Sequence, residues 1–113
     1  MTRASVFHIV AAPDWDSALA GGSYTPESLV TEGFVHLSGE HQVTGVANEH
    51  YRDGCDLVVV ELDPDLLGRD LVEEDLCGKG ETFPHLYGPV PTSATVAVHP
   101  LPRIDDGSYR FPG

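Results

Sequence analysis

Gly33-Phe34-Val35-His36-Leu37-Ser38 is the stretch from which we start to interpret the fold of this chain. Its glycine follows a helix-like run, its apolar residues predict a short strand, and its serine stands where another helix can begin. The strand carries one histidine, and a buried polar group without a hydrogen-bond partner costs about 1–3 kcal/mol. We therefore expect His36 to meet other polar groups in the folded protein.

Two further histidines stand in apolar surroundings far from this stretch. His8 lies within Phe7-His8-Ile9, and His85 lies within Phe83-Pro84-His85-Leu86-Tyr87-Gly88-Pro89. We expect the three histidines to share one site. Structural interpretations of the same histidines stay open, because a buried imidazole often bonds only a neighbouring carbonyl group.

The length and the charge of the chain limit its class. A chain of 113 residues is expected to form one domain, which we place at residues 1–102. Eighteen acidic and six basic residues give a formal net charge of −12, which disfavours extended contact with duplex nucleic acid or an anionic membrane. A small anionic ligand remains compatible, because local N–H groups act at short range.

The cysteines and the apolar runs of the chain indicate the cellular compartment in which the protein is expected. Cys55 and Cys77 form no CxxC pair, and no apolar run is long enough for a signal peptide or a membrane span. We therefore expect a cytoplasmic protein with reduced thiols.

The order of the predicted elements favours an α+β fold, with helices early and strands late. Strands are expected at 5–10, 34–37, 57–62, 70–74 and 94–98, and two to three short helices at 13–19, 25–32 and 40–52. The nearly continuous apolar run at 57–62 predicts a central strand. Two prolines predict a stiff, irregular stretch at 83–89, and residues 103–113 are expected to form a loosely attached tail.

Several motifs together resemble one protein family. The chain is similar to the bacterial domain of unknown function 952 family over about residues 5–101. The shared features are Trp15, Gln42, the strand at 57–62, and the stretches 33–38 and 83–89, which match GF[IV]HLS and FPHLYGP. The resemblance implies a fold similar to that of ADP-ribosyltransferases: a split, strongly bent β-sheet with helices at its edge and a cleft that holds NAD.

The resemblance also implies roles for single residues. His8 matches the position on the first core strand that reaches a ribose, and His36 matches the second position, which lines the nicotinamide pocket. This pairing is similar to the His/His subgroup that includes the RNA 2′-phosphotransferases. The third position stays open among His85, Glu74 and Glu81.

These positions predict a site for NAD or a related small nucleotide. Cleavage of the nicotinamide–ribose bond is assisted by positioning and electrostatic stabilisation, so His8 and His36 are expected to grip ribose hydroxyls. Tyr24 or Tyr87 is expected to stack on a ring of the ligand. Ser38 at a helix start is expected to help hold the pyrophosphate, and Glu74 is assigned to the cofactor side of the cleft.

Two other classes of function remain as alternatives. Three imidazoles and a water can bind zinc, although local ligand spacing such as HxxxH is missing here. A non-catalytic module that binds a nucleotide or a protein partner is the other alternative, because a fold does not determine a function.

Overall fold

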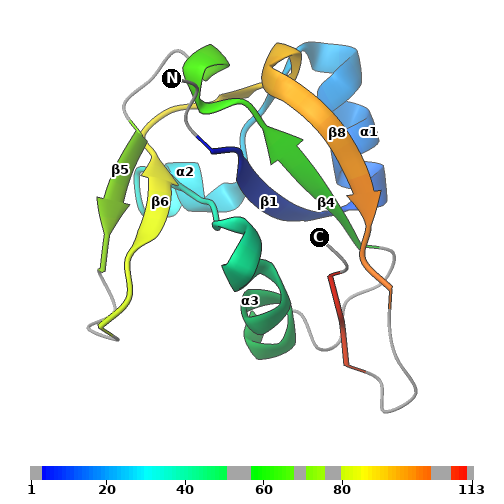
Figure 1. Cartoon of the computed structure of the whole chain (residues 1–113). Coiled ribbons are helices and arrows are strands. Elements are labelled where there is room, and N and C mark those ends of the chain that lie inside the picture. The colour runs from blue at the N-terminus through cyan, green and yellow to red at the C-terminus, as the bar shows by residue number, and fades with distance from the viewer. Residues whose placement is uncertain (1–3, 51–56, 68–70, 76–79, 103–107, 112–113) are drawn as a thin grey trace.

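Strand β4 (Leu57–Leu62) is the centre of the main antiparallel sheet, as its apolar run predicted. It pairs with β1 (Val6–Ala11) on one side and with β8 (Thr95–Pro100) on the other (Figure 1). The computed structural model describes residues 4–50, 57–67, 71–75, 80–102 and 108–111. Cys55 and Cys77 lie outside these residues.

A second sheet carries two of the three histidines. It has the order β3-β6-β5, formed by β3 (Val35–His36), β6 (Phe83–Leu86) and β5 (Leu71–Glu74). The two sheets meet where the N–H of Phe7 donates to the carbonyl of Ser38 and the N–H of Ser38 donates to the carbonyl of Phe7, both at 2.8 Å. A short ribbon pairs β2 (Ser23–Tyr24) with β7 (Val90–Pro91).

Three α-helices complete the described structure and confirm the α+β class. They are α1 (Ala12–Gly21), α2 (Glu27–Thr31) and α3 (Val43–His50), and three 3₁₀ turns lie at Glu40–Gln42, Pro64–Leu66 and Thr92–Ala94. On α1, Trp15 and Ala18 are buried, whereas Leu19 is exposed. None of the helices in the described ranges is long and apolar enough to cross a membrane.

The core consists of two clusters, because successive side chains of β1 point to opposite faces of the main sheet. Val6 and Val10 pack with residues of α1 and of the second sheet. Phe7 and Ile9 pack with α3 and with residues close to the C-terminus, including Phe111. All five residues from Val6 to Val10, including His8, are therefore buried.

The stretch at 83–89 was expected to be irregular, and this prediction was wrong for its first half. Residues Phe83–Leu86 form β6, the middle strand of the second sheet. Pro84 has no N–H to donate, but its carbonyl accepts the N–H of Leu37 at 3.0 Å. A proline is compatible with a strand where its missing donor is not needed, and composition alone does not reveal such a position.

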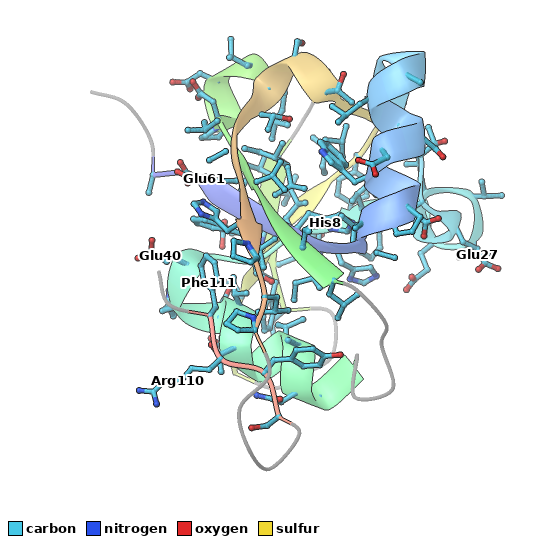
Figure 2. All side chains as sticks on the ribbon, turned by 90° about the vertical axis from the view of Figure 1, so that its right-hand side faces the viewer. His8, Glu27, Glu40, Glu61, Arg110 and Phe111 are labelled. Atoms are coloured by element: carbon cyan, nitrogen blue, oxygen red, sulfur yellow. The ribbon has the colours of Figure 1, made fainter. Side chains whose placement is uncertain are left out.

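Two further expectations need correction. Ser38 does not open a helix, because its backbone bonds Phe7 and the next 3₁₀ turn begins after Gly39. The C-terminal segment is not loosely attached at Tyr109 and Phe111, which are both buried. The amide of Asn48 bonds both the N–H and the carbonyl of Tyr109, whereas Arg110 points away from the domain (Figure 2).

The glycine that ends α2 provides a test of the fold. Gly33 has φ +88° and open space around its missing side chain, so Gly33→Ala adds backbone strain without a clash. We expect the free energy of unfolding to fall by about 1–2 kcal/mol in urea titrations. Gly45→Ala on the exposed side of α3 is the matched control, and it should raise stability by about 0.5–1 kcal/mol. Equal effects of the two variants would contradict the left-handed conformation of Gly33.

Candidate functional site

His8 is a buried histidine beside the junction of the two sheets. Its Nδ1 lies 2.8 Å from the carbonyl oxygen of His36, and a carbonyl only accepts, so Nδ1 carries the proton and donates. Burial lowers the pKa of His8 to about 4, against the opposing effect of the hydrogen bond to His36. The imidazole is therefore neutral at pH 7, and its Nε2 is an acceptor.

The acceptor on His8 has a counterpart on Trp15. Neither His8 Nε2 nor Trp15 Nε1 has a hydrogen-bond partner among the described residues, although both atoms are buried. Both rings contact the ring of Tyr24, with centroids 5.2 Å from that of His8 and 5.8 Å from that of Trp15. Each unpaired buried group costs about 1–3 kcal/mol, so a ligand that satisfies one recovers part of that cost.

Tyr24 also lines an open hollow of about 440 Å³ between α1 and the start of α2. The lining is mostly polar, and its polar side chains carry hydroxyl and carboxyl groups. The residues that form it are Asp14, Ser17, Ala18, Ser23, Tyr24, Thr25, Pro26 and Glu27. Figure 2 shows His8 inside the domain and Glu27 pointing outward on α2. Tyr24 thus connects the buried His8 to a surface depression.

His36 and His85 form a second group on the outer face of the second sheet. They are direct cross-strand partners, and their ring centroids lie 5.4 Å apart. The buried ring of Phe34 packs against both, at 4.8 Å from His36 and 4.4 Å from His85. The side chain of His36 is 52% exposed, and its Nε2 lies 3.0 Å from the carboxylate of Glu32.

Glu74 joins His85 to Tyr87. Its Oε1 lies 3.1 Å from His85 Nδ1 and accepts the hydroxyl of Tyr87 at 2.5 Å. The bond from Tyr87, more than that from His85, holds the pKa of Glu74 below its ordinary value, and the same bond raises the pKa of Tyr87. An ionised carboxylate only accepts, so it fixes the proton of His85 on Nδ1 and leaves Nε2 as the acceptor.

The predicted site residues therefore fall into two groups. His36, His85, Tyr87 and Glu74 lie together on the outer face, while His8 and Tyr24 lie beside the hollow. His8 is linked to the first group through the backbone carbonyl of His36, not through its side chain. Ser38 is not at a helix start, so the geometric basis for its pyrophosphate role is absent.

Two other sequence hypotheses are resolved by local contacts. Among the residues that the structure describes, no three histidine, cysteine or carboxylate side chains are arranged to hold a metal ion. Glu81, a candidate for the third position, accepts from the amide of Gln42, which also bonds Gly39 and Thr82. Glu81 thus belongs to a structural contact that fixes the chain after Gly39.

Sequence reasoning did not assign Phe34, Glu32 and Trp15 to the site. Phe34 stands next to Gly33 in the opening motif, and its position two residues before His36 places both on one face of a strand. Glu32 lies four residues before His36, but the helical rule for this spacing does not explain their contact, because α2 ends at Thr31 and His36 lies on β3. No sequence signal indicates that the Trp15 indole N–H would lack a partner.

The fold and the site define a small α+β domain in which two antiparallel sheets meet beside a buried, neutral histidine. The chain belongs to the family described as protein of unknown function (DUF952), whose model matches residues 9–98. The X-ray crystal structure of protein CC0527 from Caulobacter crescentus is similar, with 31% identity, a TM-score of 0.83, and 94% of this chain and 93% of that chain covered. The solution NMR structure of CC0527 has 31% identity and a TM-score of 0.79, over 92% of this chain and 90% of that chain. Among curated proteins, none matches this chain.

The buried state of His8 predicts a pH dependence of stability. Its pKa is about 4 in the folded protein and 6.5 as the ordinary value, so the unfolded chain binds more protons between these pH values. Stability therefore falls as the pH falls through this window, by about 2 kcal/mol between pH 7 and pH 5. In His8→Gln this contribution should vanish from the difference between urea titrations at the two pH values. Equal pH dependence of the two proteins would contradict a buried neutral His8.

The contact between Glu74 and Tyr87 predicts a titration that NMR can follow. Glu74→Gln removes the carboxylate that raises the pKa of Tyr87, so that pKa should fall toward the ordinary tyrosine value. The ring signals of the four tyrosines, followed against pH, measure this change. Glu73→Gln is the control, because Glu73 bonds Thr82. A Tyr87 pKa that is equally affected by both substitutions would exclude the assigned contact.

Proposed function

We propose that this protein binds NAD or ADP-ribose at the junction of its two sheets. The supporting observation is His8, whose Nδ1–H is fixed by a backbone carbonyl and whose Nε2 is a buried acceptor without a partner among the described residues. A ribose hydroxyl is a matching donor for such an atom. The adjacent Tyr24 ring offers a face on which a base or nicotinamide ring can stack.

The outer face supplies the groups for a reaction. His36 is half-exposed beside His85, and His85 is oriented by Glu74 with Nε2 as its acceptor. In this proposal His8 and His36 position the ribose, and His85 accepts a proton from an attacking hydroxyl group. When bound, NAD supplies the reactive nicotinamide–ribose bond. The proposed class is ADP-ribosyl transfer or 2′-phosphate transfer on an ADP-ribosyltransferase-like fold.

A non-catalytic nucleotide-binding module is the second candidate. It is favoured by the carboxylates that lie beside two of the histidines, Glu32 beside the half-exposed His36 and Glu74 beside the buried His85. A negative face is unfavourable for phosphates, and within the described residues Arg110 is the sole lysine or arginine. Binding without turnover is the outcome that separates this candidate from an enzyme.

Calorimetry with NAD and with ADP-ribose tests the binding proposal. We expect heat from both ligands, and a loss of about tenfold in affinity for His8→Gln, which corresponds to about 1.4 kcal/mol. His41→Gln is the matched control, because His41 is exposed on the 3₁₀ turn at Glu40–Gln42. The absence of heat with either ligand at millimolar concentration would overturn the proposal.

Release of nicotinamide then decides between the enzyme and the module. The protein is incubated with NAD and a 2′-phosphorylated RNA, and free nicotinamide is measured. An enzyme should release it, and His36→Ala and His85→Ala should reduce the rate while retaining the fold. Binding of NAD without release assigns the protein to the non-catalytic class.

A further inference from the structure

We infer that Trp15 Nε1–H and His8 Nε2 together form a donor–acceptor pair that recognises a phosphate-free group of the ligand, namely a primary carboxamide or a hydroxyl. The group enters from the hollow past the ring of Tyr24. This inference rests on the proposed function, and it names the end of the nucleotide that the hollow accepts.

The two buried atoms are chemically complementary. The fixed tautomer of His8 makes Nε2 an acceptor, and an indole nitrogen is only a donor. A carboxamide or a hydroxyl has both a hydrogen-bond donor and an acceptor. One such group can therefore bond His8 Nε2, Trp15 Nε1 or both. A carboxylate or a phosphate dianion has acceptors only, and it is repelled by the lone pair on His8 Nε2.

The hollow is lined by groups that suit the same kind of ligand. Its lining contains the hydroxyl groups of Ser17, Ser23 and Thr25 and the carboxylates of Asp14 and Glu27, without a lysine or an arginine. Such a lining offers acceptors to hydroxyl and amide N–H groups, and it repels anions. The hollow and the buried pair thus select the same class of group.

Tyr24 controls the access. Its ring contacts both buried rings and also lines the hollow, so Nε2 and Nε1 are enclosed while the ring keeps this position. Tyr24 lies on β2, which pairs with β7 over two residue pairs. In this proposal, a change in the rotamer of Tyr24, without a change in the sheets, opens the path from the hollow to the pair.

The chain offers a direct probe, because Trp15 is its single tryptophan. The indole N–H gives one signal in a ¹⁵N-correlated NMR spectrum, and a new hydrogen bond shifts this signal. We titrate the full chain with nicotinamide and, as the matched control, with nicotinate, which replaces the carboxamide by a carboxylate. Nicotinamide should shift the indole signal in a saturable way, and nicotinate should leave it in place.

Variants add a second readout. Trp15→Phe keeps an aromatic ring and removes the donor, so calorimetry should show about tenfold weaker binding of nicotinamide. Asp16→Asn, an exposed change on the same helix outside the lining, should bind as the wild type does. An unmoved indole signal at saturating nicotinamide, or an equal shift with nicotinate, overturns the inference.

The outcomes separate this inference from the proposed function. A shifted indole signal with nicotinamide, together with no heat from NAD or ADP-ribose, supports the donor–acceptor pair and removes the nucleotide proposal. Heat from NAD with an indole signal that no ligand moves supports nucleotide binding and places it away from Trp15.

Discussion

The structure depends on the place where β1 crosses the free edge of β3. Two backbone hydrogen bonds between Phe7 and Ser38 join the sheets there, and the ring of His8 adds a third bond to the carbonyl of His36. Strand β3 has only two residues, so its unpaired edge would otherwise leave buried polar groups without partners. A histidine at position 8 meets this requirement with one nitrogen, and its other nitrogen is buried without a hydrogen-bond partner among the described residues.

The histidines occupy chemically different environments although they have similar neighbours in the sequence. His8 is enclosed and neutral, whereas His36 is half-exposed beside a carboxylate. His85 is enclosed as well, but a carboxylate fixes its proton. The three imidazoles therefore differ in their hydrogen-bond partners, which are a backbone carbonyl for His8 and a carboxylate for each of His36 and His85.

The sequence was sufficient for the class, the central strand and the end of α2 at Gly33. These features depend on local chemistry: an apolar run, a left-handed glycine, or a motif of few residues. It was insufficient where a long-range contact decides the structure. Pro84 lies inside a sheet, where Leu37 uses its carbonyl, and Phe111 is buried against the ring of Phe7, which is more than 100 residues away in the sequence. The separation of His8 from the outer face was also unpredictable from the sequence. The alternation of side chains along a strand shows which residues share a face, but the register of strand pairing decides which residues of other strands lie beside them.

The contact of Asn48 and Phe7 with residues 109–111 also bears on the biosynthesis of the protein. One face of β1 receives its aromatic cover from Phe111, and its sheet is completed by β8. Core contacts of such long sequence separation form slowly, because a long chain must be closed before they stabilise anything. During synthesis Val43 and Ala47 of α3 are available to this face of β1 early, whereas its full cover requires that residue 111 has emerged from the ribosome.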